Sequence, residues 1–271
     1  MKLLTTLILF FFLSPLSYSQ ITIEGTIKEA GTGKSISYVN IGVVGKNIGT
    51  VSDDNGKFKL TIPSGYSEET VRISMLGYSP QQYKVRELEK LVEGKGIIMQ
   101  PSSFELPGVV VSNRKLKEAI LGNNTESQST TIGFTSGKLG NEVGIVIKIR
   151  KSPTFIKSFQ ASVVSKDNNP VKLRLNFYSV KDGMPDKLIQ DKNIIVSAPI
   201  QNGKLVVDLQ KYNIVAEDDF FVSLEWIEDD SGKIEFSGSV FKGAIIVRGT
   251  SQGDWEKIGM FGIGFTVRVA Y

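Results

Sequence analysis

The sequence predicts an all-β protein built from two β-sandwiches, and three observations lead to that prediction. Apolar and polar residues alternate with a period of two, as in segment 21–28, where Ile21, Ile23 and Ile27 fall on one face. Turn-forming residues recur at short intervals, which is typical of antiparallel sandwiches. Strand patterns resume after a polar stretch at 123–131. A chain of 271 residues with 41% hydrophobic and 22% charged residues is long enough for two such cores.

The first nineteen residues have the form of a signal peptide. Met1-Lys2 precedes an apolar run over 3–13, and the small residues Ser17 and Ser19 precede Gln20. The run is about half the length of a membrane-spanning helix, which needs about 20 residues. We therefore expect residues 1–19 to be removed and no transmembrane helix to remain. The product would be periplasmic, associated with the outer membrane, or secreted. It would not be a lipoprotein, because the sequence has no cysteine.

Residues 20–113 are predicted to form the first sandwich. Besides segment 21–28, its β-rich runs lie at 38–44, 58–62, 71–75 and 109–111. Between these runs lie turn clusters at 31–33, 45–47, 53–56 and 63–65. This alternation of short strands and turns is what a sandwich requires.

Residues 114–131 are predicted to be a linker with a short helix. Arg114 to Leu121 has room for two helical turns ending at Gly122, and 123–131 is polar. Residues 132–271 are then predicted to form a second, jelly-roll-like sandwich. Its strand signals lie at 144–149, 155–164, 171–178, 193–197, 204–209, 220–226, 233–236, 244–247 and 262–269.

Several motifs in the first half resemble the carboxypeptidase-regulatory-like domain, a transthyretin-like sandwich. These are Gly25-Thr26-Ile27, Gly33-Lys34-Ser35-Ile36, Val39-Asn40-Ile41, Gly49-Thr50-Val51-Ser52-Asp53, Gly56-Lys57-Phe58 and Ser74-Met75-Leu76-Gly77-Tyr78. The resemblance covers about residues 21–113 and implies a seven-stranded accessory module without catalytic residues. Such a module often precedes outer-membrane nutrient receptors, joined by a segment similar to 106–111. A receptor of some 22 strands would not fit in this chain. The second half looks like a companion sandwich.

The absence of cysteine and histidine excludes several classes of chemistry. Ser-His-Asp and Cys-His catalysis, disulfides, and zinc sites built on thiolates or imidazoles are all impossible. Metallo-carboxypeptidase activity is therefore not expected. A net charge of +4 with the two signs interspersed does not indicate a nucleic-acid partner. We predict no enzymatic activity and assign no catalytic, cofactor-binding or metal-ligating residue; calcium is the one ion considered, without a complete motif.

Two glycine-containing loops suggest ligand sites but are better interpreted as turns. Gly33-Lys34-Ser35 ends like a phosphate-binding loop, yet Lys28 stands where that motif needs glycine, and a strand follows. Asp53 to Gly56 has calcium-type ligands, but Val51 and Ile62 replace the acidic residues of an EF-hand. Asn55-Gly56 predicts a hairpin turn.

Carboxylates and aromatic residues in the second half provide further hypotheses. Acidic clusters at 217–219 and 228–230 flank one strand and are interpreted as solvated turns; calcium binding by either cluster together with loop 167–169 is the alternative. Glu225 and Glu235 are candidates for a glycosidase pair if they are cross-strand neighbours. The aromatic residues either fill the core or include a sugar-stacking platform: Tyr178, Tyr212, Trp226, Phe241 and Trp255.

These patterns predict a non-enzymatic exported accessory protein that binds a ligand or partner, either an envelope protein or a surface polysaccharide. Two alternatives stay open. The second sandwich is a carbohydrate-binding module or carbohydrate-active enzyme, or the chain is a small outer-membrane protein, as the alternating end Phe265, Val267, Val269 and Tyr271 suggests.

Overall fold

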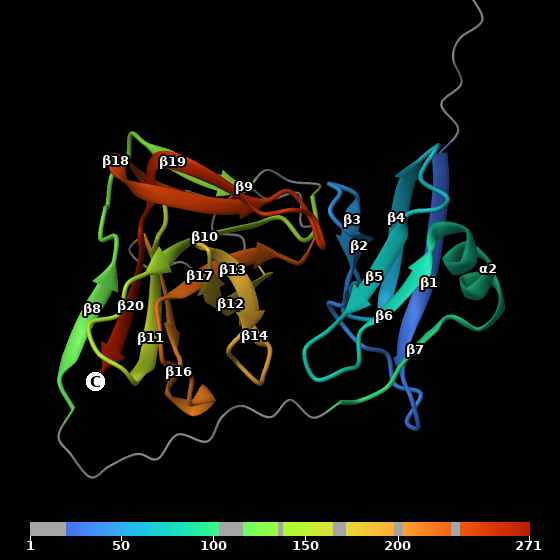
Figure 1. Cartoon of the computed structure of the whole chain (residues 1–271), viewed down its shortest axis with the longest axis horizontal. Coiled ribbons are helices and arrows are strands. Elements are labelled where there is room, and N and C mark those ends of the chain that lie inside the picture. The colour runs from blue at the N-terminus through green and yellow to red at the C-terminus, as the bar shows by residue number, and fades with distance from the viewer. Residues whose placement is uncertain (1–19, 103–115, 135–137, 165–171, 198–202, 229–233) are drawn as a thin grey trace, which may run out of the picture.

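The computed structural model describes residues 20–102, 116–134, 138–164, 172–197, 203–228 and 234–271. The prediction of an all-β architecture is confirmed. Strands β1 to β7 form one sandwich and strands β8 to β20 form a larger one (Figure 1). We call these the N-terminal and C-terminal sandwiches. The predicted signal peptide at 1–19, the strand at 109–111 and the segment 106–111 lie outside the described residues.

The N-terminal sandwich has seven strands in the described residues, in two sheets. One sheet has the order β4-β1-β7 and the other the order β3-β2-β5-β6. The strands are β1 (Gln20–Glu29), β2 (Asn40–Val43), β3 (Gly49–Val51), β4 (Lys57–Pro63), β5 (Thr70–Ser74), β6 (Gln81–Lys84) and β7 (Ile97–Met99). In β1 the side chains of Ile23 and Ile27 are buried, as the alternation predicts. They pack with Leu60 and Ile62 of β4 to fill the space between the sheets.

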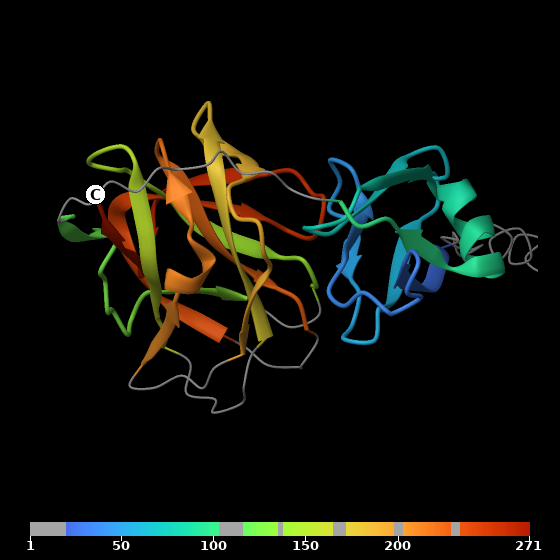
Figure 2. The ribbon, with the colours of Figure 1, turned by 90° about the horizontal axis from the view of Figure 1, so that it is seen from below.

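A helix, α2 (Val85–Lys95), joins β6 to β7 and was not predicted. Val85 and Leu88 are fully buried in the N-terminal core. Their three-residue spacing matches one helix face. The Glu87 carboxylate accepts a hydrogen bond from the Lys84 backbone N–H at 3.2 Å, which satisfies a donor at the helix start. Figure 2 places α2 at the end of this sandwich remote from the C-terminal sandwich.

Both glycine loops are turns in the structure. Gly33 has a φ of 67° and donates its N–H to the Glu29 carbonyl oxygen, and no helix follows it. At 53–56, one carboxylate oxygen of Asp53 accepts hydrogen bonds from the backbone N–H groups of Asn55 and Lys57. The expectation of a hairpin at this second turn is wrong, because β3 and β4 lie in different sheets and the turn connects the sheets.

The C-terminal sandwich also has two antiparallel sheets. The larger has the order β13-β12-β17-β10-β18-β19, with β14 beside β12 and β9 beside β18; the smaller has the order β15-β11-β20-β8, with β16 beside β11. Its strands are β8 (Glu118–Gly122), β9 (Thr131–Phe134), β10 (Glu142–Ile147), β11 (Thr154–Ser162), β12 (Lys172–Lys181), β13 (Met184–Leu188), β14 (Ile194–Ser197), β15 (Lys204–Asp208), β16 (Val215–Ala216), β17 (Phe220–Trp226), β18 (Ile234–Arg248), β19 (Glu256–Ile263) and β20 (Phe265–Ala270). A short 3-10 helix, η1 (Gln210–Tyr212), follows β15.

The prediction of a linker with a short helix at 114–131 is wrong where the structure forms strand β8. Residues 118–122 form a strand that pairs with β20, from Glu118 opposite Ala270 to Gly122 opposite Thr266. Leu121 is buried in the C-terminal core. Pairing with the free edge of β20 satisfies backbone groups that a two-turn helix would leave unpaired, so tertiary context overrides the local helix signal.

Three predicted strand segments have different boundaries in the structure. The signals at 233–236 and 244–247 belong to the single strand β18, whose pairing with β19 is interrupted by a bulge between Val240 and Ala244. The signal at 262–269 is split at Gly264. This residue donates its N–H to Ser237 of the larger sheet and accepts from Ser162 of the smaller sheet. Phe265 and the alternate residues of β20 then point into the core.

The tip of the β18–β19 hairpin rests on the N-terminal sandwich. A Cβ atom at Gly42 would lie 2.1 Å from the Ser251 carbonyl oxygen, so the absence of a side chain in β2 permits this contact. Gly45 donates its backbone N–H to Gln252, and the Gln252 amide donates to the Ser74 hydroxyl at 2.9 Å. Within the described residues, no helix has the length and apolar character needed to cross a membrane.

Candidate functional site

An open pocket lies at one end of the C-terminal sandwich, where β11, β16 and β17 meet η1. It has a volume of about 470 Å³, within the usual range for small-molecule sites. Its walls contain the side chains of Phe155, Ile189 and Ile214. Apolar walls of this kind provide a surface for the apolar face of a ligand.

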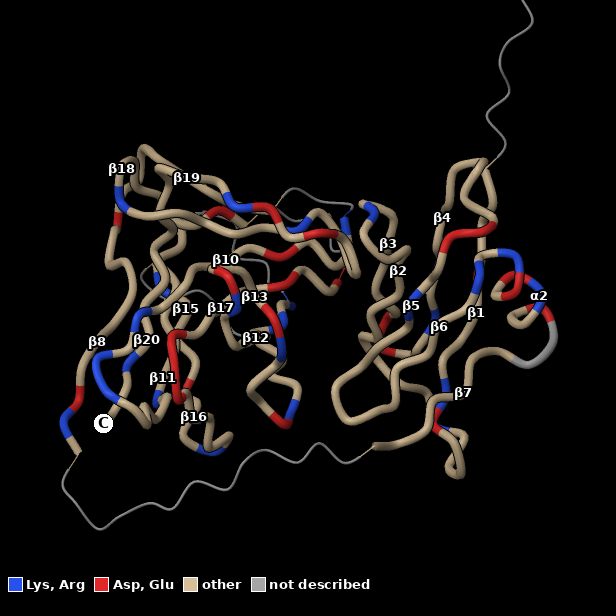
Figure 3. Tube along the Cα trace, in the orientation of Figure 1, with Lys and Arg blue, Asp and Glu red and all other residues tan. Residues whose placement is uncertain are grey.

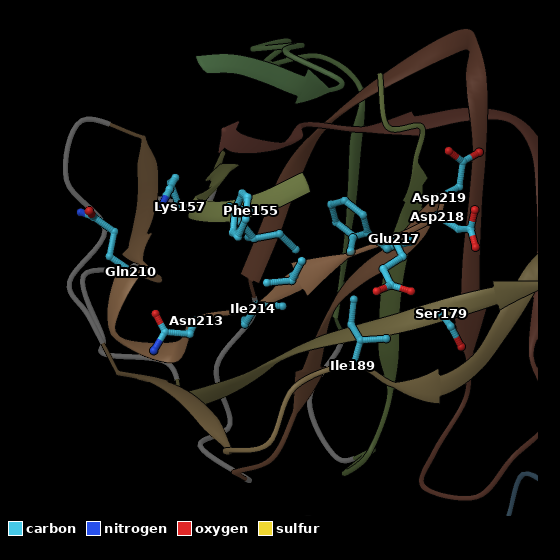
Figure 4. Close-up of a pocket in the computed structure, with 14 residues that line it drawn as sticks. Phe155, Lys157, Ser179, Ile189, Gln210, Asn213, Ile214, Glu217, Asp218 and Asp219 are labelled. Atoms are coloured by element: carbon cyan, nitrogen blue, oxygen red, sulfur yellow. The ribbon is translucent and has the colours of Figure 1, made fainter. Parts of the chain in front are cut away.

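The polar residues of the open pocket stand on opposite sides of these apolar walls (Figure 4). Gln210 and Asn213 lie on one side, and Asp218 and Asp219 lie on the other. Asn213 adopts the left-handed conformation, with a φ of 49°, at the end of η1. Asp219 accepts a hydrogen bond from the Ile149 N–H at 2.9 Å, which fixes one carboxylate of the rim. The pocket thus combines amides, carboxylates and an apolar centre.

A cationic side chain completes the open pocket. The Lys157 ammonium lies 5.7 Å from the centre of the Phe155 ring, a distance at which a cation attracts the ring face. Glu217 and Asp218 are exposed, so their carboxylates remain solvated in the unliganded protein. Hydrogen-bond donors and acceptors are therefore both available to a polar ligand.

A second group of charges lies at the opposite end of β17 and is almost entirely buried. We call it the closed charge cluster: Glu142, Arg174, Asn176, Glu225 and Arg248. Both carboxylates are fully buried. Arg248 donates to Glu142 at 2.6 Å, Arg174 lies 3.5 Å from Glu225, and the Asn176 amide donates to both carboxylates at 2.9 and 3.1 Å. Such burial of charge is tolerated only with this degree of pairing.

The environment of the closed charge cluster shifts its acid–base equilibria. Burial raises the pKa of the Glu225 carboxyl, Arg174 opposes the rise and Glu142 adds to it. Burial also raises the pKa of the Tyr178 hydroxyl, which donates to Glu142 at 3.2 Å. The Arg248 guanidinium stacks 4.7 Å above the ring of Trp255. These contacts connect Tyr178 and Trp255 to the cluster.

The hypothesis that Glu225 and Glu235 are cross-strand neighbours is wrong. Glu225 pairs with Glu142 of β10 and Arg174 of β12, whereas Glu235 lies on β18 opposite Gly133 of β9. The β10 strand separates β17 from β18 in the sheet. The carboxylate beside Glu225 is Glu142, which the sequence analysis did not select. Both are buried, so neither can reach the glycosidic bond of a polysaccharide from this position.

The two acidic clusters flanking β17 have different environments. Residues 217–219 line the open pocket. Glu228 forms an ion pair with Lys172 at 2.7 Å. Asp229, Asp230 and loop 167–169 lie outside the described residues. Among the residues that are described, no group of three or more carboxylates has the geometry to hold a metal ion.

The aromatic residues considered for a sugar platform do not gather on one surface. Trp226 is buried against Phe134, and Tyr178 and Trp255 pack together with ring centres 5.8 Å apart. Tyr212 packs against the C-terminal core. Phe241, by contrast, is 80% exposed at the β18 bulge.

Sequence reasoning missed Phe155 and the amides of the open pocket, and also Glu142. Phe155 was assigned to a strand, and the positions of Gln210 and Asn213 depend on η1, which carries no distinctive motif. Glu142 precedes the apolar run 143–147, a position that is usually exposed. Its burial depends on pairing with β17 and β18, which are about 80 and 100 residues further along the chain.

Comparisons with solved structures show only distant likeness. The cysteine protease and lectin-like domains of Cwp84, a surface layer associated protein of Clostridium difficile, share 9% identity with a TM-score of 0.41; the match covers 86% of this chain and 58% of that one. A structure of infectious bursal disease virus, Gx strain, shares 10% identity with a TM-score of 0.27, covering 95% of this chain and 58% of that one.

The sequence comparisons concern the N-terminal sandwich. A TonB-dependent receptor SusC of Bacteroides thetaiotaomicron is 35% identical over 85 residues, which is 31% of this chain and 8% of the receptor. The chain therefore matches only a small part of that relative. The family model described as CarboxypepD_reg-like domain matches residues 23–111. Residues 23–111, which include most of β1 and all of β2 to β7, therefore belong to the CarboxypepD_reg-like domain family.

Proposed function

We propose that the chain is a non-enzymatic accessory protein of the bacterial cell envelope whose open pocket binds a saccharide. The observation that carries the proposal is the open pocket itself, where the Phe155 ring lies between amide groups on one side and carboxylates on the other (Figure 4). An aromatic ring can cover the apolar face of a pyranose, while amides and carboxylates pair with its hydroxyl groups.

The envelope location rests on two further observations. The N-terminal apolar run has the form of an export signal. The N-terminal sandwich is similar to part of a TonB-dependent receptor. An exported chain of this kind would meet surface polysaccharides directly, and its N-terminal sandwich would be free to contact an envelope protein.

The binding test measures retention of the purified chain on a panel of insoluble polysaccharides, with and without calcium, while released reducing ends are assayed in the same tubes. Retention without product supports the proposal. Product formation would contradict the non-enzymatic assignment, and absence of retention on every polysaccharide would contradict the saccharide assignment.

Two variants connect retention to the open pocket. Phe155→Ala removes the central ring and is expected to lower retention at least about tenfold, since stacked aromatic contacts contribute on the order of 1 kcal/mol beyond area burial. Glu118→Gln changes an exposed residue on β8 in the smaller sheet and serves as the control. Equal retention of the wild type and Phe155→Ala would place binding elsewhere.

A further inference from the structure

A second pocket lies at the junction of the two sandwiches. This junction pocket has a volume of about 280 Å³. Its walls come from β5 and the loop 75–80 of the N-terminal sandwich and from β12, Leu188 and Asn193 of the C-terminal sandwich. The pocket exists only while the two sandwiches are in contact.

Among the described residues, six hydrogen bonds join the two sandwiches at this junction. The hairpin tip of the C-terminal sandwich provides three, in which Gly45, Ser251 and Gln252 are the donors. β12 provides two more, from Lys172 and Arg174 to the hydroxyl and carbonyl oxygens of Tyr38, and the Asn193 amide donates to the Leu76 carbonyl at 3.4 Å. Hydrogen bonds between the two sandwiches therefore border the junction pocket.

The charged residues that line the junction pocket in the described chain are all cationic. Two arginines line it, Arg72 from β5 and Arg174 from β12, and no Asp or Glu of the described chain does. Arg72 forms no ion pair with any carboxylate in the described ranges. Arg174 is 4% exposed, and its one carboxylate contact within the described ranges, Glu225, belongs to the closed charge cluster.

Donor groups of both arginines are left without acceptors. The Nε atoms of Arg72 and of Arg174 are buried and have no hydrogen-bond partner among the residues that the structure describes. Buried donors on a charged group are costly when they stay unpaired, so they are usually satisfied. Tyr78 and Ser74 also line the pocket but already pair with Glu29 and Gln252. The hydrogen-bond donors that still lack acceptors are therefore those of the two guanidinium groups.

We propose that the junction pocket binds a small oxyanion, a carboxylate or phosphate on a body no larger than a monosaccharide, between Arg72 and Arg174. A guanidinium presents donors in a planar fork that matches both oxyanions. The volume is just below the range of drug-sized sites, which limits the ligand to a small molecule. Because each sandwich supplies one arginine, the bound anion joins them and stabilises their contact. This site is separate from the open pocket and does not depend on the proposed function.

The test is calorimetric titration of the purified full chain with four probes: glucuronate, glucose 1-phosphate, inorganic phosphate and uncharged glucose. The charged sugars are expected to bind with dissociation constants on the order of 1 mM or below, and glucose at least about tenfold more weakly. The ratio of the dissociation constants of the two charged sugars identifies the preferred oxyanion. Binding of inorganic phosphate measures the affinity due to the anion without the sugar. Absence of binding by all three anions would overturn the proposal.

Two variants with the same charge change locate the binding. Arg72→Gln removes one fork from the junction pocket and is expected to weaken anion binding at least about tenfold. Arg86→Gln removes an exposed arginine of α2 that pairs with Glu68, and it is expected to bind as the wild type does. Circular dichroism confirms that each variant is folded. Equal anion binding by Arg72→Gln and the wild type would overturn the proposal; Arg72→Lys, which keeps the charge without the fork, is expected to bind with intermediate affinity.

Discussion

The two ends of strand β17 carry acidic residues in opposite environments. At one end, residues 217–219 line one side of the open pocket, and two of their three side chains are exposed. At the other end, Glu225 is fully buried beside Glu142, and two arginines and an amide surround the pair. The seven residues of β17 therefore extend from the solvated carboxylates of the open pocket to the desolvated closed charge cluster.

The difference between these ends shows what a carboxylate contributes in each setting. In the closed charge cluster, every charge is desolvated, so stability depends on keeping all partners together. At the open rim, water solvates the carboxylates, so their charges are available to a ligand and contribute little to folding. We expect substitutions at the closed end to change stability and substitutions at the open end to change binding.

The largest expected effect is that of Glu142→Gln. This change removes the charge that pairs with Arg248 at 2.6 Å and takes away the direct ion-pair partner of a largely buried guanidinium. Breaking one partner of a buried ion pair costs about 3–5 kcal/mol. We therefore expect the free energy of unfolding, measured by urea denaturation, to fall by about that amount.

A double variant distinguishes the loss of the ion pair from a general disruption of packing. In the double variant Glu142→Gln/Arg248→Gln, neither charge remains unpaired, so it is expected to be less destabilised than the sum of the two single variants. Additive losses would mean that the two residues act independently, which would contradict a coupled closed charge cluster.

Glu225→Gln is expected to have a smaller effect that depends on pH. Burial raises the folded-state pKa of Glu225 above the ordinary value of 4.5. The protonated carboxyl then stabilises the fold fully below the unfolded-state pKa, and this contribution is lost as the pH rises through the folded-state pKa. The wild type should therefore lose stability relative to Glu225→Gln as the pH rises from below 4.5 through the raised folded-state pKa.

The measurement is a series of urea unfolding curves for both proteins across that pH range. Glutamine retains an oxygen that can accept the Asn176 hydrogen bond, so the variant isolates the effect of charge. A stability difference that is constant with pH, or that increases in favour of the wild type, would contradict the raised pKa.

The sequence predicts local features of this molecule better than its long-range pairing. The period-two alternation in β1, the buried strand 220–226 and the turn at Gly33 follow from local patterns, and each lies where expected. The resemblance to a regulatory-like domain rests on ordered motifs and holds for residues 23–111. These are features that neighbouring residues determine.

The features that sequence reasoning missed depend on distant partners. β8 is a strand because it meets β20, which is about 150 residues further along the chain. Glu225 and Glu235 lie on consecutive predicted strands, which suggested that they are neighbours. In the structure β10, which comes earlier in the chain, lies between β17 and β18. Strand order across a sheet is set by packing of the whole sandwich, so the partner of a buried carboxylate cannot be read from local spacing.

The smallest expected effect is that of Asp218→Asn at the open rim. The side chain is exposed and lines the open pocket, and its charge is solvated in the unliganded protein. Exposed substitutions of this kind usually change stability by no more than about 0.5 kcal/mol. We therefore expect an unfolding curve close to that of the wild type, together with weaker saccharide retention in the polysaccharide assay. A loss of several kcal/mol would mean that the open end supports the fold as the closed end does, and the contrast between the two ends of β17 would then be lost.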